Sequence, residues 1–211
     1  MDPVIPSVAR NPGDGWFAVV ASHAARSLAT LGMTLLLIAC HYESDLPRLF
    51  PVPDAALVNE KGQPFHLDAN KGFVTVYDFI FTNCSGTCPM MTASMRRLTP
   101  KVPKDAKVRF ISISVDPTRD TPTVLRDYAM HVRNDDRWTF LTGDRNTIRD
   151  LSINGFKLAA GDPGPNGDPL LHSSKFAVAD KSGTIREYYG GTDGDAPEHV
   201  ANSVRDLLRE D

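Results

Sequence analysis

Residues 73–91 read FVTVYDFIFTNCSGTCPMM, a strand-like run followed by two cysteines and the start of a helix-like run. Residues 73–81 are almost continuously apolar and rich in aromatic and β-branched side chains, which predicts a strand buried on both faces. Residues 90–98 are typical of a helix. The sequence therefore places Cys84 and Cys88, with three residues between them, at the junction of a buried strand and a helix.

Strand-like and helix-like segments alternate after this junction. Residues 108–115 (VRFISISV) predict a second buried strand. A helix is expected next, with Thr121 as its cap, Pro122 in its first turn and its end near Val132. A short strand over 138–141 and a short helix over 146–151 follow. This alternation predicts parallel strand pairing.

Hairpins are predicted on either side of this alternating region. Residues 56–67 form the first, around Lys61-Gly62. Residues 175–179 and 184–189 form the second, after a Gly/Pro-rich loop over 161–169. A helix over 197–209 closes the chain. We therefore expect an α/β protein with a thioredoxin-like fold: a mixed central sheet flanked by helices, with an N-terminal β-hairpin.

The N-terminal region resembles a bacterial export signal. Residues 28–39 (LATLGMTLLLIA) are apolar but shorter than the roughly 20 residues that span a bilayer, which favours a signal-peptide core. The run ends in Leu37-Ile38-Ala39-Cys40, which resembles a lipoprotein box with Cys40 as the lipidated residue. A plain secretory signal with an incidental cysteine, or an uncleaved anchor, are the alternatives.

These features divide the chain into a signal region (1–40), a tether (41–53) and one folded domain (54–211). Its 211 residues are 41% hydrophobic and 23% charged, which fits one globular domain. The net charge of −3 and the lack of Lys/Arg clusters argue against nucleic-acid binding. We expect membrane attachment through the lipid, on the extracytoplasmic (periplasmic) face.

Two neighbouring thiols can bind a metal, cycle through a disulfide or form a static bridge. A helix N-terminus stabilises thiolates and lowers their pKa. A four-ligand zinc site is unfavourable, because the chain has only three cysteines. Soft sulfur together with one imidazole would suit Cu(I). His172, which follows the Gly/Pro-rich loop and precedes a strand, is the candidate imidazole; a histidine that merely ends the loop is the alternative.

Three blocks in this order resemble the Sco/SenC family of copper proteins: FTNCSGTCPMM (81–91), VDPTRDTP (115–122) and LLHSSKFAVADKSG (170–183). The resemblance covers about residues 54–208. It implies one copper ion held by Cys84, Cys88 and His172. It also implies a metallochaperone that delivers copper to the binuclear copper site of cytochrome c oxidase, or to another periplasmic copper protein.

Several residues near these blocks carry two interpretations. Asp116 and Asp120 match the acidic segment of the family, as partners of the site or of a docking protein. Locally, Asp116 suits a turn with Pro117 and Asp120 suits a helix start, and we favour these structural roles. The thioethers of Met90, Met91 and Met95 are more typical of helix packing than of copper ligation.

Other functions use the same cysteines. A thiol–disulfide oxidoreductase that keeps partner cysteines reduced is the main alternative, and only this reading would make the chain an enzyme. The extra residue relative to C-x-x-C argues mildly against a general reductase. A peroxidase of the peroxiredoxin type lacks its expected proline. A static bridge in a binding module leaves His172 unexplained.

Overall fold

The cysteine motif lies next to the middle of a mixed sheet. The computed structural model describes residues 42–84, 86–158 and 173–210. Within these residues the sheet has eight strands in the order β1-β8-β7-β4-β5-β6-β2-β3. They are β1 (Phe50–Pro51), β2 (Ala56–Asn59), β3 (Pro64–His66), β4 (Val74–Ile80), β5 (Val108–Ser114), β6 (Trp138–Thr142), β7 (Lys175–Ala179) and β8 (Thr184–Gly190).

Parallel strands form the centre of the sheet and antiparallel strands form its sides. β4, β5 and β6 pair in parallel, because the helical connections after β4 and after β5 return the chain to the same starting edge. β7 and β8 form the second hairpin, and β7 also pairs antiparallel with β4. β2 and β3 form the first hairpin, with Gly62 at a φ of 77° in its turn. The predicted mixed sheet with its N-terminal hairpin is confirmed.

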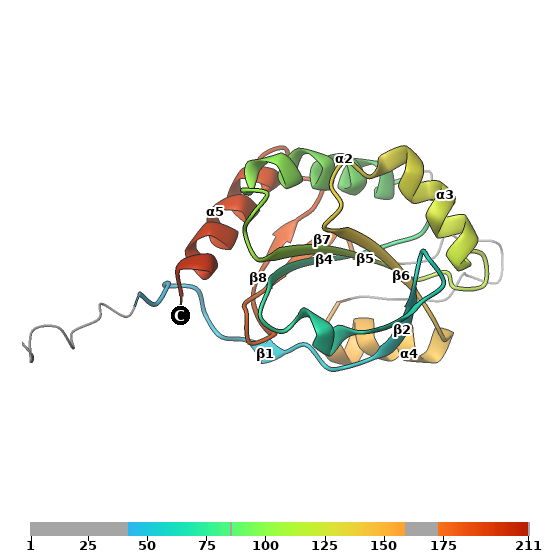
Figure 1. The fold of residues 1–211 in the computed structure, drawn as a ribbon, viewed down its shortest axis with the longest axis horizontal. Coiled ribbons are helices and arrows are strands. Elements are labelled where there is room, and N and C mark those ends of the chain that lie inside the picture. Colours follow the sequence, from blue (N-terminus) through green and yellow to red (C-terminus); the bar gives the residue numbers. More distant parts are fainter. Residues whose placement is uncertain (1–41, 85, 159–172, 211) are drawn as a thin grey trace, which may run out of the picture. The chain divides into compact units, whose positions relative to one another are not determined.

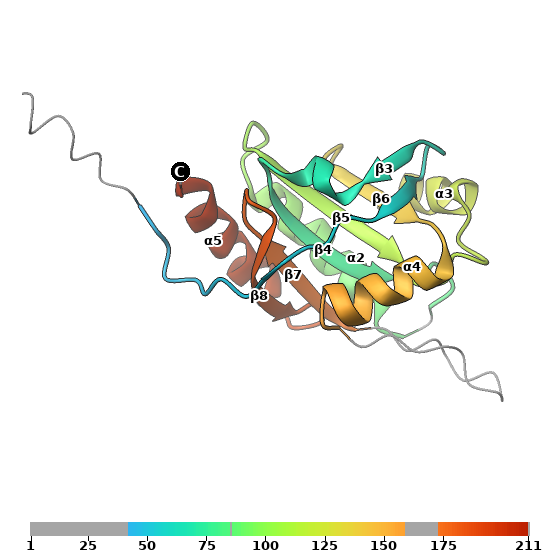
Figure 2. The ribbon, with the colours of Figure 1, turned by 90° about the horizontal axis from the view of Figure 1, so that it is seen from below.

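Helices cover both faces of the sheet (Figure 1). α2 (Cys88–Leu98), α3 (Pro122–Val132) and α5 (Ala196–Arg209) lie on one face, and α4 (Arg145–Asp150) lies on the other, as Figure 2 also shows. One π-helical turn, Leu151–Gly155, continues α4. α3 has the predicted bounds, with Thr121 as its N-cap accepting a hydrogen bond from the backbone of Val124.

Two apolar cores lie on the two faces of the sheet. β4 supplies both, because successive side chains of a strand point to opposite faces. Val74, Val76 and Ile80 join the core under α2, α3 and α5, which also contains Cys88. Tyr77 and Phe79 join the core on the α4 side, where Phe156 packs edge-on against both rings. The cysteine motif is thus supported from below by a rigid strand.

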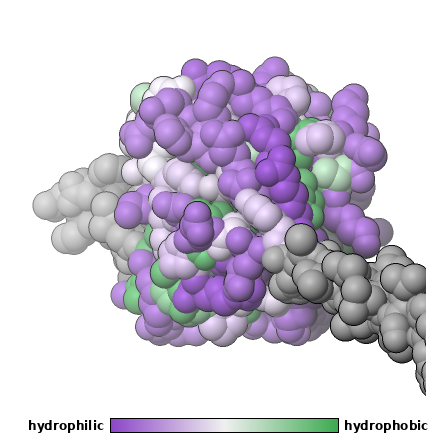
Figure 3. All heavy atoms as spheres, turned by 90° about the vertical axis from the view of Figure 1, so that its left-hand side faces the viewer, coloured by the Kyte–Doolittle hydropathy of each residue, from purple (hydrophilic) through white to green (hydrophobic). Residues whose placement is uncertain are grey.

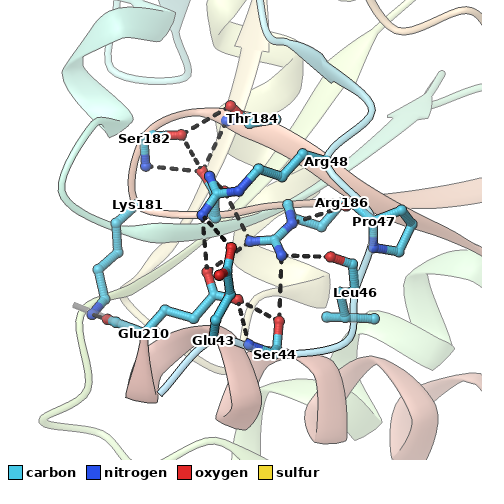
Figure 4. Close-up of polar contacts among 11 residues, drawn as sticks. Glu43, Ser44, Leu46, Pro47, Arg48, Lys181, Ser182, Thr184, Arg186 and Glu210 are labelled. Carbon is cyan, nitrogen blue, oxygen red and sulfur yellow. Dashed lines mark hydrogen bonds and ion pairs between the residues drawn. The ribbon is translucent and has the colours of Figure 1, made fainter. Parts of the chain in front are cut away.

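Residues 44–53, expected to be part of a tether, are bound to the domain. Phe50 and Pro51 pair with β8 as β1. Arg186, 1% exposed on β8, donates hydrogen bonds to the carbonyl oxygens of Leu46 and Pro47 at 2.6 and 2.9 Å (Figure 4). A buried guanidinium needs several acceptors, and the sequence pattern did not reveal that these acceptors are backbone groups upstream.

The same arginine joins this segment to the end of the chain. Arg186 contacts the carboxylates of Glu210 at 2.7 Å and Asp180 at 3.1 Å, and Ser44 donates a short hydrogen bond to Glu210 (Figure 4). Burial alone would raise the pKa of Glu210, but Arg186 and Ser44 hold it at about 2. These contacts show that folded structure begins before residue 54.

The surface on the side where α5 lies is mostly hydrophilic, with only small hydrophobic patches (Figure 3).

Candidate metal and thiol site

The two cysteines of the motif lie at the carboxyl end of β4 and at the start of α2. Cys84 follows β4 after a short turn and is partly buried. Cys88 is the first residue of α2 and is 1% exposed. The helix begins here rather than at residue 90, because Pro89 suits a first turn in which no backbone donor is needed. The predicted order of strand, cysteine loop and helix is confirmed.

The pKa of Cys84 is lowered from its ordinary value. Burial by itself would raise it, because a thiolate loses hydration. Hydrogen bonds from the backbone of Cys88, Gly86 and Thr87, and from the Cys88 side chain, outweigh that effect. These amides belong to the start of α2, where the helix dipole also favours negative charge. Cys84 is therefore the thiol that ionises more readily.

The pKa of Cys88 is raised, mainly by burial. The side chain of Cys84 and the negative charge of Asp78 act in the same direction, and the backbone of Phe81 offsets only part of the effect. The pair thus combines one partly exposed, readily ionised thiol with one buried thiol. Such a pair can chelate a soft metal ion or close into a disulfide after attack by Cys84.

Asp78 is a buried carboxyl group beneath the thiols that sequence analysis did not single out. Asp78 lies between Val76 and Ile80 on the same face of β4, so its side chain faces the same core as Cys88. Among the described residues, neither of its carboxylate oxygens has a hydrogen-bond partner at normal geometry. Burial raises the pKa of Asp78 to about 7, an effect that the nearby Ser112 hydroxyl offsets only partly. An aspartate inside an otherwise apolar strand was the available signal.

Asp120 fixes the approach to the cysteine loop. It is fully buried and accepts hydrogen bonds from the backbone and hydroxyl of Thr82, at 3.0 and 2.5 Å, and from the hydroxyl of Ser114 at 2.5 Å. The prediction that Asp120 stabilises a helix start is wrong, because Thr121 caps α3 and the Asp120 carboxylate turns inward instead. Asp120 therefore ties the segment before Cys84 to β5.

Asp116 forms the predicted turn. Its carbonyl oxygen accepts hydrogen bonds from the backbone of Arg119 and Asp120, at 3.1 and 2.8 Å. Its carboxylate lies 3.8 Å from the Arg119 guanidinium. The turn carries Asp120 into the core, so the two aspartates have linked but different structural roles.

The methionines of α2 divide between core and surface. Met91 and Met95 are fully buried in the apolar core, which confirms their packing role. Met90 is 54% exposed.

A groove of about 290 Å³ opens beside the two cysteines. It lies between α2 and α3, which Thr92 and Tyr128 join through a 2.8 Å hydrogen bond between their hydroxyls. Apolar side chains dominate its lining, and one cation, Arg96, stands at its edge. The lining residues are Phe81, Thr82, Cys84, Cys88, Pro89, Thr92, Ala93, Arg96, Tyr128 and Val132.

His172 and Cys40 lie outside the described residues. The histidines that are described have other neighbours: His66 contacts Asp54 at 3.0 Å, His131 bonds the Asp127 carbonyl and His199 contacts Asp195. Among the described residues no three His, Cys, Asp or Glu side chains group as a metal site. Every described helix is too short or too polar to cross a bilayer.

Strand direction nevertheless brings the chain after residue 172 to the cysteine end of the sheet. β7 runs antiparallel to β4, so its first residue, Lys175, lies at the end where β4 delivers Cys84. The carbonyl oxygen of Ser174 accepts a 2.7 Å hydrogen bond from Gly191, and the Met91 side chain packs at the same glycine. Ser174 is therefore close to the first turns of α2.

A mixed sheet with a Cys-x₃-Cys pair between its central strand and a helix defines the class: a thioredoxin-like protein with a paired-thiol site. The family model described as SCO1/SenC matches residues 52–209. Since this match covers well over half of the chain, the protein belongs to the SCO1/SenC family, and the predicted family is confirmed.

Solved structures of similar proteins support this assignment. A SCO1/SenC family lipoprotein from Bacillus anthracis is 31% identical, with a TM-score of 0.68 over 75% of this chain and 95% of the other. BsSco, a member of the Sco family of cytochrome c oxidase assembly proteins with a disulfide switch, is 32% identical, with a TM-score of 0.68 over 79% and 97%. ScoI from Bradyrhizobium japonicum, solved with copper bound, is 26% identical, with a TM-score of 0.63 over 74% and 98%. These matches confirm the thioredoxin-like fold.

Proposed function

We propose that this protein binds one copper ion through Cys84, Cys88 and His172 and passes it to a partner during cytochrome c oxidase assembly. The observation that carries the proposal is the thiol pair at the start of α2, with one thiol poised to ionise and the other buried beside it. Thiolates are soft ligands that suit Cu(I). The copper-bound ScoI structure supports copper as the metal.

His172 completes the proposed ligand set. The described residue Lys175, three positions after it, begins β7 at the end of the sheet that carries Cys84, which supports this assignment. Two thiolates and one imidazole make a low-coordinate site. A partner can take copper from such a site by adding its own ligands one at a time.

The proposed partner is the copper-site subunit of cytochrome c oxidase, or another periplasmic copper protein. The description of BsSco as a member of a family of oxidase assembly proteins supports the first choice. Copper is then a cargo rather than a resident cofactor, and the protein acts as a metallochaperone rather than as an enzyme.

The proposed location is the extracytoplasmic face of a membrane. Residues 1–40 would act as a signal region, with Cys40 as the lipidated residue. The description of the Bacillus anthracis relative as a lipoprotein supports this anchor. The soluble domain would then follow a short tether after Cys40.

A second function is a thiol–disulfide oxidoreductase that keeps partner cysteines reduced for metal loading. The different pKa directions of Cys84 and Cys88 favour it, because an attacking thiolate and a buried resolving thiol are what such exchange requires. The disulfide switch identified in BsSco also supports this alternative.

Replacement of His172 by alanine separates the two functions. Thiol–disulfide exchange needs only Cys84 and Cys88, whereas a three-ligand copper site needs the imidazole. We expect His172→Ala to lose at least about tenfold in Cu(I) affinity, equivalent to about 1.4 kcal/mol, while its Cys84–Cys88 bridge still forms. Competition with a Cu(I) chelator and thiol titration measure the two properties.

Oxidase assembly in cells gives the functional readout. Delivery predicts that the His172→Ala strain loses assembly under copper limitation and recovers with added copper. His66→Ala is the matched control. His66 lies on the edge strand β3 and contacts Asp54, so it is not close to the thiols at the end of β4. Full assembly in the His172→Ala strain would favour reduction of partner cysteines. Unchanged Cu(I) affinity would contradict the ligand assignment.

A further inference from the structure

The outward face of α2 bears cations and apolar side chains next to the thiols. Its exposed side chains recur at helical spacing along one side of the helix: Pro89, Met90, Ala93, Arg96 and Arg97. α2 contains no acidic residue. This surface, which we call the α2 face, begins at the residue next to Cys88 and is therefore the surface that a docked partner's metal ligands would lie beside.

Two hollows flank the α2 face and share Ala93 and Arg96 as a common wall. The groove beside the cysteines is one of them. The second has a volume of about 670 Å³ and is lined by Met90, Ala93, Ser94, Arg96, Arg97, Asn134 and Thr192. A bound segment can therefore cross Ala93 and fill both hollows. The groove beside the cysteines combines an apolar lining with an arginine, whereas the second hollow is lined mainly by polar side chains and two arginines, and protein interfaces favour aromatic, apolar and arginine side chains of this kind.

The charge of Arg96 is not balanced by the described part of the domain. Its guanidinium donates a 3.4 Å hydrogen bond to the carbonyl oxygen of His131, and no carboxylate among the described residues forms an ion pair with it. Arg97 bonds the Ser94 hydroxyl and acts at a distance on Glu198, whose pKa it helps to lower together with Lys101. Arg96 is thus the cation that remains available to an incoming carboxylate.

We propose that the α2 face is the docking surface for the protein that receives the copper, and that it binds an acidic segment of that protein. The inference rests on the proposed function for the identity of the partner. A carboxylate of the segment pairs with Arg96, and a neighbouring apolar side chain enters the groove between α2 and α3. This arrangement places the partner's metal ligands next to Cys84.

Charge reversal at Arg96 tests the proposal. The probe is the purified, copper-free copper-site subunit of cytochrome c oxidase from the same organism, titrated against the full-length protein. We expect Arg96→Glu to weaken the complex at least about tenfold and to remove most of its salt dependence. Arg149→Glu is the matched control: it makes the same charge change at an exposed residue of α4, on the opposite face of the sheet (Figure 1).

A steric variant separates shape from charge. Ala93→Arg adds a positive charge to the face and places a bulky side chain where the two hollows meet, so a loss of binding cannot come from a loss of positive charge. We expect it to weaken the complex about as much as Arg96→Glu does. Thermal unfolding should show that all three variants fold as the parent protein does, since each changed side chain is exposed.

The outcomes distinguish docking from copper chemistry. Unchanged affinity of Arg96→Glu for the subunit, or an equal loss in Arg149→Glu, overturns the docking proposal. A loss of Cu(I) affinity in Arg96→Glu also overturns it, because the residue would then belong to the copper site. If the parent protein binds the subunit through Arg96 but transfers no copper, the docking surface stands and the proposed function fails.

Discussion

Cys84 and Cys88 are close in sequence but differ in chemistry because of what surrounds each sulfur. Amides at the start of α2 point at Cys84, whereas Cys88 is enclosed by the core. The sequence pattern of the motif does not encode this difference. It follows from the exact place where the helix begins, and it sets the order in which the two thiols lose their protons.

Alkylation rates should report this order. In a chain beginning at Tyr42, the Cys88→Ser variant leaves only Cys84, which should reach half its maximal rate with iodoacetamide at a lower pH than an unstructured cysteine does, because its pKa is lowered. The Cys84→Ser variant leaves only Cys88, which should react slowly and only at higher pH. Rates followed from pH 5 to 10 by mass spectrometry provide the measurement. A faster reaction of Cys88 at neutral pH would contradict the assignment.

Asp78 should make stability depend on pH. Its pKa of about 7 lies above that of an unfolded aspartate, so the folded state keeps a proton that the unfolded state releases. Between pH about 4 and 7 the parent protein therefore loses up to about 1.4 kcal/mol per pH unit through this residue. Above pH 7 the loss is complete and stays constant.

The Asp78→Asn variant removes this term. Its free energy of unfolding relative to the parent should rise by up to about 4 kcal/mol between pH 4 and pH 8, measured by urea denaturation. Asp105→Asn, at an exposed position, should show no comparable change. Parallel pH profiles for the parent and Asp78→Asn would show that the folded protein does not keep Asp78 protonated.

At the scale of elements, the segment 44–53 works as part of the domain. It supplies β1, and its backbone accepts hydrogen bonds from the buried Arg186. Leu46 packs against one core, and Phe50 and Val52 pack against the other. A segment rich in proline with no periodicity can therefore be ordered by strand pairing, by packing against the cores and by a buried cation that needs acceptors.

A truncation series tests this role. A chain beginning at Tyr42 should unfold with the same free energy as a chain that includes residue 41 and those before it. A chain beginning at Asp54 should lose about 2–4 kcal/mol, because Arg186 is left without the Leu46 and Pro47 acceptors. Guanidinium chloride denaturation of both forms gives the comparison. Equal stability would show that the segment only lies on the surface.

At the scale of the whole molecule, anchoring and copper binding should be separable. Cys40→Ala should move the protein from the membrane to the soluble fraction while its Cu(I) affinity stays unchanged, since the proposed lipid on Cys40 would supply the anchor. Cys84→Ala should stay in the membrane fraction but lose Cu(I) affinity. Fractionation and intact mass, together with Cu(I) competition, check both. A Cys40→Ala protein that stays in the membrane with an unaltered mass would contradict lipidation.

Much of the architecture was predictable, because local patterns carry it. The apolar run 73–81, the Thr121-Pro122 helix start and the Lys61-Gly62 turn each impose one structure on their own few residues. The mixed sheet follows from their order. The helix-like run 90–98 begins two residues after the observed helix start at Cys88, because the helical pattern is clear only after Pro89, which occupies the first turn.

The amino-acid sequence by itself determined the order of the elements, the position of the thiol pair between β4 and α2, and the family. Only the tertiary structure decided that Asp120 braces Thr82, that Asp78 lies buried beneath Cys88, that Arg186 binds the upstream segment, and that Arg96 borders the groove beside the thiols. The physical reason is range. Strand, turn and cap preferences act between neighbours in the chain, whereas a buried charge is stabilised by whichever groups the folded chain brings to it from far away in sequence.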